Sequence, residues 1–262
     1  MATNFSSKVA IVTDFLKNVE DVIFKIISYI MYMLPLGAFC LIANSITVYG
    51  PRVMGGLFTF IACVWIAALI GIFAVHMPLC IFVGKVNYFK FLYEFKEAII
   101  LAISTCSSTA TLPVSTKVAK ERVGVPPAIA DFVIPLGSTA NMNGTSVFFA
   151  VITIFTCQLL GISLTPVQYV ILVVQACLLA ISCSTVPNTG LVIATTILTS
   201  FGLPLDAIGL VVGVYRFCDM IHTTSNCMGD WVSATCIASS EGVLDREICA
   251  CNLKSVEPNR AA

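Results

Sequence analysis

Long apolar segments dominate the chain, and short polar tracts interrupt them. Two such segments open the sequence, Val22–Ile46, broken by Pro35 and Gly37, and Val53–Val83, broken by Pro78. Each is longer than the roughly 20 residues that an α-helix needs to cross a bilayer. The pattern therefore predicts two membrane-crossing helices at the start of the chain.

Further along, two polar tracts, Ser104–Pro113 and Ser182–Gly190, lie between apolar flanks that are too short to cross a membrane alone. Backbone that leaves a helix at membrane depth persists only where protein or a water-filled cavity satisfies its N–H and C=O groups. We therefore expect two re-entrant helical hairpins, over about residues 89–118 and 166–202, whose tips point to a binding site near the midplane. The alternative for each tract is a polar loop outside the membrane.

Between the hairpins, an apolar segment over about residues 127–160 is interrupted at Pro135–Ser146. Two glycines, a proline and two asparagines in that stretch disfavour a continuous helix. We interpret the segment as a broken membrane helix. A last helix is expected over about residues 205–240.

Composition agrees with a membrane protein. Hydrophobic residues make up 58% of the chain and charged residues 11%, with a mean hydropathy of +0.97, whereas soluble domains average about 45–50% and about 25%. A soluble all-helical protein with a very large core would need far more charge to cover its surface. We predict an all-α integral membrane protein, and its net charge of zero gives no electrostatic basis for nucleic-acid binding.

Basic residues test the re-entrant arrangement, because Lys and Arg accumulate in cytoplasmic loops. If each hairpin returns to its own side, one side collects Lys8, Lys17 and the basic residues of segments 85–96, 117–122 and 246–260. The opposite side collects only Arg52. We therefore expect a multi-pass protein of the cell membrane with a cytoplasmic C-terminus.

The most polar helix-like stretch in the apolar part of the chain is YRFCDMIHTTSNCMGD, residues 215–230. At about 100° per residue, five of its side chains fall on one stripe that spans roughly 100° of a helix. They are Asp219, His222, Thr223, Asn226 and Asp230. Because the flanks are apolar or small, this stripe must face something polar and enclosed.

An aspartyl enzyme and an ion site are two interpretations of this stripe. Two carboxylates that share a proton can perform acid–base chemistry, but eleven residues separate Asp219 from Asp230 by about 16 Å along a helix. A nucleophile pair of His222 and Ser225 has poor helical phase. We therefore expect no enzyme and no cofactor.

The ion-site interpretation fits the donor chemistry of the stripe better. Asp230, Asn226 and Asn141 carry hard oxygen donors, and exposed carbonyls at broken helices coordinate Na⁺. Asp219 suits an ammonium group, because a carboxylate in a membrane is costly without a cationic partner. Its alternative role is an interhelical hydrogen bond.

Most of the twelve cysteines lie in apolar runs, where cysteine behaves as a small hydrophobe. Cys249 and Cys251 differ, because they lie two residues apart near the polar C-terminus. They form a weak thiol-pair signal.

The residues resemble one family, the dicarboxylate/amino acid:cation symporters, which include excitatory and neutral amino-acid transporters and archaeal aspartate transporters. Four motifs carry the resemblance in the family's order, SSTATLP at the first tip, NMNGT in the broken helix, VPNTG at the second tip and DMIHTTSNCMGD in the last helix. The similarity extends from about Val19 to Ser240. It implies a sodium-coupled amino-acid symporter of the plasma membrane, which works as a homotrimer by elevator-type movement.

The resemblance also divides the chain into an N-terminal segment with a scaffold-type helix (1–50), a transport core (51–245) and a cytoplasmic tail (246–262). Family members carry several more helices before the point where this chain begins, and those helices supply much of the trimer scaffold. The alternative to a symporter is a truncated paralogue or fragment without transport of its own, which acts as a subunit, a regulator or a relic.

Ligand residues follow from the resemblance, position by position. Asp219 would take the substrate amino group, and Thr223 and Asn226 would serve the amino group and the α-carboxylate. The implied substrate set is Cys106, Ser107, Ser108, Thr145, Val186, Gly190, Asp219, His222, Thr223 and Asn226.

Sodium ligands are implied in the same way. Gly137, Asn141, Asn226 and Asp230 match one site, and backbone carbonyls near Thr139, Ala180, Ile181 and Cys183 match a second. The broken-helix residues Met142 and Asn143 complete the implied set.

Departures from the family pattern concern specificity and ion binding. His222 stands where members that carry acidic substrates have an arginine, and Tyr215 replaces its acidic neighbour. Asn143 replaces the aspartate of NMDGT, which serves a third cation site, and the second tip has Ser182 and Thr185 where glycines are usual. We hypothesise a neutral or polar amino-acid substrate, or an acidic one only when His222 is protonated.

Overall fold

The computed structural model describes residues 53–183 and 189–252, together with isolated residues between 15 and 47. The helix expected over 22–46 falls mostly outside these residues, as do Val186 and the end of the tail, 253–262. Within the described residues every regular element is a helix, apart from one isolated β-bridge between Val86 and Asn252. The all-α class is confirmed.

The first described helix, α2 (Val53–Gly71), continues through two π-helical turns, η1 (Ile72–His76) and η2 (Leu79–Val83). Pro78 lies between these turns, so the break expected there is a local widening rather than an end. Proline lacks an N–H group and cannot complete the regular ladder, and π-helical turns accommodate such an irregularity within a continuing helix. The resulting segment Gly55–Val83 has 29 residues and is long and apolar enough to cross a membrane.

The first hairpin consists of α3 (Tyr88–Glu94) and α4 (Lys96–Thr105), followed by α5 (Ser108–Glu121). Its tip is short, because only Cys106 and Ser107 leave the helical conformation. Cys106 has a left-handed backbone with φ 52°, and the Ser107 hydroxyl accepts the N–H of Ala110 at 3.3 Å. Most of the polar tract 104–113 is therefore helical.

The segment expected to be a broken helix forms α6 (Pro127–Ala140) and α7 (Asn143–Leu159). The interruption is confined to Asn141 and Met142, whose backbones are not helical. Together α6 and α7 form the second segment of the described chain with the length and apolarity of a membrane span, Pro127–Leu159.

The second hairpin is built from α8 (Pro166–Ile181) and α9 (Thr189–Ser200). Thr165 and Gln168 start α8 with a reciprocal capping box, which satisfies backbone donors at its N-terminus.

The single last helix expected over 205–240 consists of two helices, α10 (Asp206–Val212) and α11 (Tyr215–Ser240). The chain leaves the regular helix at Gly213 and Val214. There the Val214 N–H donates to the Val211 carbonyl at 3.0 Å, which makes a tighter turn than that of an α-helix. A glycine among β-branched valines has low helix propensity, which explains the position of the break.

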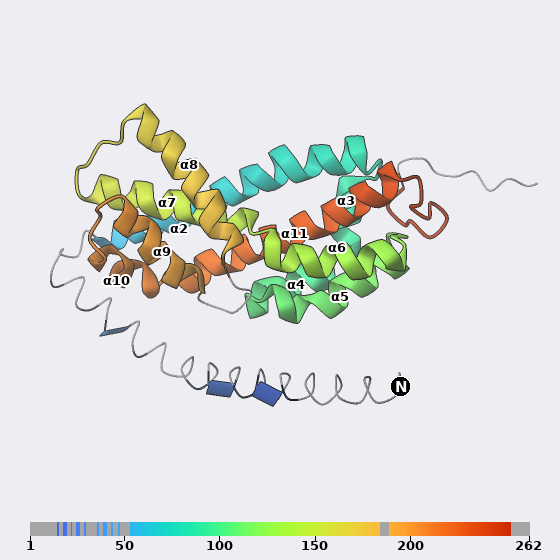
Figure 1. Ribbon diagram of the computed structural model, residues 1–262, viewed down its shortest axis with the longest axis horizontal. Helices are drawn as coiled ribbons and strands as arrows, with labels where there is room; N and C mark the ends of the chain where they lie inside the picture. Colours follow the sequence, from blue (N-terminus) through green and yellow to red (C-terminus); the bar gives the residue numbers. More distant parts are fainter. Residues whose placement is uncertain are drawn as a thin grey trace, which may run out of the picture.

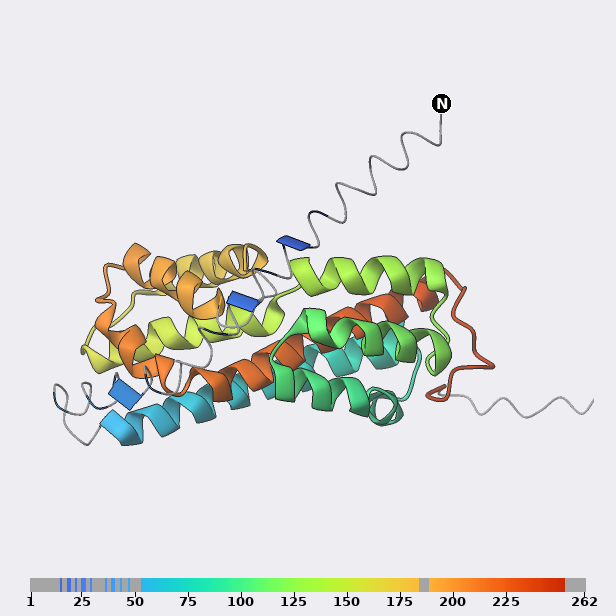
Figure 2. The same cartoon turned by 90° about the horizontal axis from the view of Figure 1, so that it is seen from below.

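Helices α2 and α11 run along the length of the molecule, with α3–α6 towards one end and α7–α10 towards the other (Figure 1 and Figure 2). The first hairpin starts and finishes at one end, where Asn87 and Arg122 both bond to the segment after α11. At the opposite end, Cys157, Leu198 and Leu203 form a buried cluster between α7 and the end of the second hairpin. The tip of the first hairpin therefore lies near the middle of the molecule (Figure 1).

Gly124 and Gly242 offer a matched test of how the segment after α11 packs against the loop after the first hairpin. Both have positive φ, 76° and 70°, but a Cβ at Gly124 would overlap the Asp245 carbonyl oxygen while nothing lies within 4 Å of one at Gly242. We expect Gly242→Ala to cost only the left-handed strain of about 1–2 kcal/mol. Gly124→Ala should cost roughly 1–3 kcal/mol more, because a tightly packed contact must also open. Melting curves of the purified variants in detergent measure the difference, and equal losses would contradict the tight docking of Asp245.

Candidate functional site

The polar stripe of α11 is buried in the middle of the molecule. All five of its members are at most 5% exposed, although they lie on a helix whose other faces pack in the apolar core. Buried polar groups are costly unless they find partners. The partners of these side chains therefore define the candidate site, and its members are Asp219, His222, Thr223, Asn226 and Asp230.

Asn226 holds the start of α7. Its Oδ1 accepts the N–H groups of Gly144 at 2.7 Å and Thr145 at 3.4 Å, in the first turn of α7. Its Nδ2 donates to the Thr145 hydroxyl at 3.0 Å and to the sulfur of Met142 at 3.2 Å. The first N–H groups of a helix have no partner within the helix. Asn226 supplies that partner from α11.

Asp230 and Asn141 form a second cluster, one turn further along α11. The Asn141 amide donates to Asp230 Oδ1 at 2.9 Å and to the Asn226 carbonyl at 3.3 Å. Gly137 of α6 completes the cluster, because a Cβ at this position would overlap Asp230 Oδ1. The structure therefore brings together all four residues of the first implied sodium site.

Asp219 occupies the other end of the stripe. Its Oδ1 accepts the Thr223 hydroxyl proton at 2.7 Å, and His222 Nε2 lies 3.3 Å from the same oxygen. The histidine nitrogen is within ion-pair distance but is not aligned for a hydrogen bond. The second oxygen, Oδ2, is buried without any partner among the described residues. A carboxylate oxygen in this state is complementary to an incoming cationic donor.

Aromatic side chains enclose His222. Phe148 and Tyr215 lie with ring centroids 5.5 Å and 5.8 Å from the imidazole, and the Thr145 hydroxyl lies 3.4 Å from His222 Nδ1. Tyr215 also reaches the second hairpin, since a Cβ at Gly190 would overlap its hydroxyl. The two residues that depart from the family pattern, Tyr215 and His222, are thus neighbours in one apolar and aromatic wall.

Cys106, at the tip of the first hairpin, and Cys183, just after α8, lie near Asp219. The thiols of Cys106 and Cys183 are close enough to interact electrostatically with its carboxylate. Ser108, which begins α5, is 3.6 Å from the thiol of Cys227 on α11. The Ser107 hydroxyl caps α5 itself, since it accepts the Ala110 N–H.

The residues of the second implied sodium site are not joined in this structure. Thr139 is exposed, and its hydroxyl donates to the Leu136 carbonyl within α6 at 2.9 Å. In the described part of the chain no hydrogen bond links Thr139 to Ala180, Ile181 or Cys183, and the Ala180 carbonyl already accepts from Cys183 at 3.0 Å. The implied substrate residue Val186 lies outside the described residues.

Two residues of this region, His76 and Arg216, were not predicted from the sequence. The Asn143 amide nitrogen lies 2.7 Å from Nε2 of His76, a buried histidine of η1. Arg216 donates to the carbonyls of Ser104 and Thr105 at 2.9 and 3.2 Å, so it caps the end of α4 at the first tip. A signal existed for His76, because a lone ionisable residue inside an apolar span is rare without a functional or structural partner.

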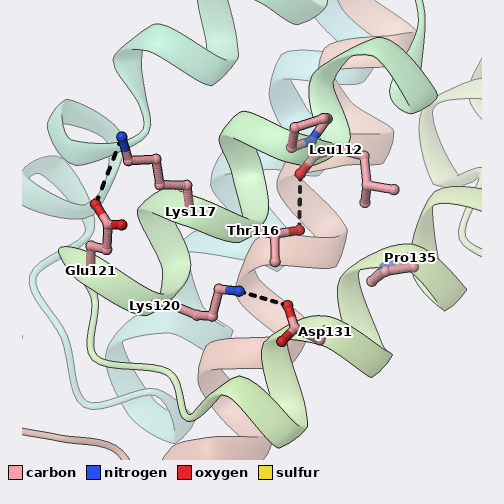
Figure 3. Close-up of a pocket in the computed structure, with 8 residues that line it drawn as sticks. Leu112, Thr116, Lys117, Lys120, Glu121, Asp131 and Pro135 are labelled. Carbon is pink, nitrogen blue, oxygen red and sulfur yellow. Dashed lines mark hydrogen bonds and ion pairs between the residues drawn. The ribbon is translucent and has the colours of Figure 1, made fainter.

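A separate pocket of about 400 Å³ opens between α5 and α6. Lys120 and Asp131, which line the pocket, form an ion pair of 2.8 Å between α5 and α6 (Figure 3). None of the candidate substrate or sodium residues lines this pocket. It is therefore distinct from the buried stripe.

The donor set of the stripe favours a hard cation over a soft transition metal. Over residues 53–183 and 189–252, no three His, Cys, Asp or Glu side chains gather in a way that could hold a metal ion. Asp230 is instead surrounded by amide and carbonyl groups. A carboxylate with neutral oxygen donors suits a hard cation, whereas thiolate and imidazole ligands suit softer metals.

Comparison with known proteins finds a family and relatives that match most of this chain. The model of the "Sodium:dicarboxylate symporter family" matches residues 1–240. The chain is 34% identical over 223 residues to excitatory amino acid transporter 1 of Mus musculus, covering 84% of this chain and 41% of that protein. It is 34% identical over 229 residues to an excitatory amino acid transporter of Caenorhabditis elegans, covering 86% and 45%.

A third relative is excitatory amino acid transporter 2 of Homo sapiens, 35% identical over 225 residues, with 84% of this chain and 39% of that protein covered. The chain thus spans about two fifths of the length of the curated relatives it matches.

Gly137 tests the Asp230 cluster independently of any ligand. Gly137→Ala should separate α6 from α11 and break the bond between Asn141 and Asp230, because the new methyl group overlaps the carboxylate. We expect a loss of roughly 1–3 kcal/mol, typical of overpacking a buried contact. Thermal melting measures this loss. Gly71→Ala, where nothing lies within 4 Å of the added methyl group, is the control and should melt at or slightly above the temperature of the parent protein, because alanine is the better helix former.

Proposed function

Because the chain belongs to the sodium:dicarboxylate symporter family, we propose that it forms the substrate- and sodium-binding part of a sodium-coupled amino-acid symporter. Members of this family are transporters and not enzymes, so the aspartyl-enzyme interpretation does not apply. One observation supports the proposal above the others: Asp219, which lies near Cys106 and Cys183, has a buried carboxylate oxygen without a partner among the described residues.

In the proposed substrate site the amino group binds Asp219. An ammonium group supplies several donors, and the unpartnered Oδ2 provides an acceptor for one of them. Thr223 already bonds to Oδ1 and fixes the rotamer of the carboxylate. The α-carboxylate would lie towards Asn226 and the first tip, where Ser108 begins α5. The remaining residues proposed to contact substrate are Cys106, Ser107, Thr145, Val186, Gly190 and His222.

The coupling ion is proposed to bind between α6 and α11. Asp230 supplies the charge, and the carbonyls of Gly137 and Asn226 together with the Asn141 side chain supply neutral oxygen donors. In this structure the Asn141 amide nitrogen faces Asp230 Oδ1 at 2.9 Å. A bound cation would replace that donor, because the cation and the N–H group compete for the same oxygen. Thr139, Ala180, Ile181 and Cys183 are the proposed second site, with Met142 and Asn143 adjoining.

The surroundings of His222 support a neutral or polar substrate side chain. An arginine could offer a fixed pair of donors to a second carboxylate, but the imidazole here lies against Phe148 and Tyr215. Its one close polar neighbour on α7 is the Thr145 hydroxyl. This wall offers van der Waals contact and a single hydrogen bond, which suits a small neutral or hydroxyl side chain better than a carboxylate.

The wider architecture of the proposal follows the family. We propose that α3–α5 and α8–α9 are re-entrant hairpins within the plasma membrane, with the C-terminus in the cytoplasm. The Arg246 guanidinium donates to the backbone carbonyl of Lys85 at 3.0 Å, at one end of the molecule. This contact supports placing the basic segments on one side. A homotrimer with elevator-type movement completes the proposal.

Ligand-dependent melting tests both the substrate and the ion. We expect an amino acid such as serine to raise the melting temperature of the purified protein only when Na⁺ is present. At a ligand concentration of about 100 times Kd the stabilisation should approach 2.7 kcal/mol. Potassium chloride at the same ionic strength is the control. A protein that melts identically with every amino acid would support the alternative of a subunit or relic without transport.

Restoring the missing charge pair should change the substrate. The double variant Tyr215→Asp with His222→Arg provides the two-pronged donor and a buried counter-charge, which a lone arginine would lack. We expect preference to move from serine towards aspartate by roughly 10- to 100-fold, the range of a charge-assisted hydrogen bond of about 1.5–3 kcal/mol. Sodium-driven uptake into liposomes at about pH 7.5, near the working range of histidine, measures it. A parent protein that already prefers aspartate to serine there would overturn the specificity proposal.

A further inference from the structure

The segment after α11, residues 241–252, folds back over one end of the molecule, and we call it the C-terminal strap. The Asp245 N–H donates to the Gly124 carbonyl at 2.9 Å, and the Asn87 N–H donates to the Cys251 carbonyl at 2.7 Å. Arg246 donates to the carbonyls of Gly84 and Lys85 at 3.2 and 3.0 Å. The strap therefore ties together the loops on both sides of the first hairpin.

Two thiols meet inside this strap. The sulfurs of Cys249 and Cys251 lie 3.3 Å apart, and neither is in a disulfide. A disulfide bond is about 2.05 Å long, so the two sulfurs need to approach by only about 1.2 Å. Two residues in a turn can make that movement by side-chain rotation and a small backbone shift.

The chemical state of the pair favours exchange with a disulfide. The hydrogen bond between the two thiols lowers the pKa of Cys249, and the nearby Arg246 guanidinium adds to this effect. The same bond and burial raise the pKa of Cys251. Cys249 therefore carries more thiolate near neutral pH than a free cysteine, which with a pKa of about 8.5 is only a few per cent ionised.

Exposure assigns different roles to the two sulfurs. Cys249 is 5% exposed and Cys251 is fully buried, so an external disulfide reaches Cys249 first. The strap is held by hydrogen bonds to loops, and such segments open locally at less than the global unfolding free energy. Access therefore does not require unfolding of the helices.

We propose that Cys249 and Cys251 form a thiol–disulfide exchange site, which reacts with small disulfides of the glutathione class and closes an intramolecular bond between the two sulfurs. Cys249 thiolate attacks one sulfur of oxidised glutathione and releases the first glutathione thiolate, which takes up a proton. The Cys251 thiol then loses its proton and attacks Cys249, releasing the second glutathione. Two protein thiols are oxidised, and one disulfide is reduced to two thiols.

The sequence supplies a clean assay for this reaction. Trypsin cleaves after Arg246 and Lys254, and the peptide EICACNLK between these sites contains both cysteines and no other. The full protein is equilibrated in detergent with defined ratios of reduced and oxidised glutathione, free thiols are alkylated, and the peptide is weighed. We expect an unalkylated peptide about 2 Da lighter than the reduced form, because two hydrogens leave, with a single midpoint across the ratios.

Variants separate the two sulfurs. Cys251→Ser should leave a stable glutathione adduct on Cys249, because the resolving thiol is gone. Cys249→Ser should react with oxidised glutathione at least about tenfold more slowly than the parent, since the remaining thiol is mostly protonated and buried. Cys236→Ser is the matched control, because its sulfur donates to the Leu79 carbonyl rather than to the pair, and its peptide should oxidise like that of the parent.

Three results would overturn the proposal. The peptide could stay fully reduced in the folded parent at every ratio, or carry only glutathione adducts. Cys249 could instead cross-link to Cys80, which lies close enough to interact with it electrostatically. The parent measurement decides all three without any variant, so a variant that fails to fold does not affect the conclusion. The assay does not involve transport, and its outcome is independent of the proposed function.

Discussion

Helices that end in the middle of this molecule leave backbone N–H and C=O groups without partners in their own helix, and the rest of the structure depends on satisfying them. Helix α11 supplies partners for two such ends. Asn226 accepts the Gly144 N–H at the start of α7, and Arg216 donates to the Ser104 and Thr105 carbonyls at the end of α4. Because one continuous helix caps both, the broken helix and the first hairpin have a single position relative to each other. Glycine at position 144 follows from the same constraint, since a side chain there would overlap the His222 carbonyl.

The groups that stabilise these interior ends are also the groups proposed to bind ligand, and this overlap has a physical cause. A buried carboxylate needs donors, and in the absence of ligand the protein provides some of them. The Asn141 amide donates to Asp230 at 2.9 Å, and the Thr223 hydroxyl donates to Asp219 at 2.7 Å. Binding of a cation or an ammonium group exchanges one donor for a stronger one. The pairs therefore keep an unliganded site stable without making it so well satisfied that a ligand gains nothing.

Much of this fold is predictable from the sequence, because interruptions of apolar segments follow from residue chemistry. Two asparagines and two glycines locate the break at 141–142, which lies within the predicted stretch. Pro78 is different: proline usually ends a helix, but π-helical turns on both sides keep this one continuous. The partners of His76 and Arg216 are also not predictable, because each reaches a residue more than 60 positions away, and no local pattern reports such a distance. The α11 stripe could be identified from helical phase, but its division into two clusters depends on where α7 begins.

Asn226 connects those two clusters, and this gives a concrete route for coupling between them. Its side chain bonds to Thr145, on the side of Asp219, and its carbonyl accepts the Asn141 amide that also holds Asp230. A cation bound at Asp230 would replace the Asn141 N–H group as the partner of the Asp230 carboxylate and of the Asn226 carbonyl. The backbone and the side chain of Asn226 belong to one rigid turn of α11, so a change at its carbonyl alters the position of its amide against Thr145. Coupling between two sites is reciprocal in free energy. If both proposed sites exist, a ligand that orders Thr145 and Asn226 would strengthen cation binding by the same factor as the cation strengthens binding of that ligand.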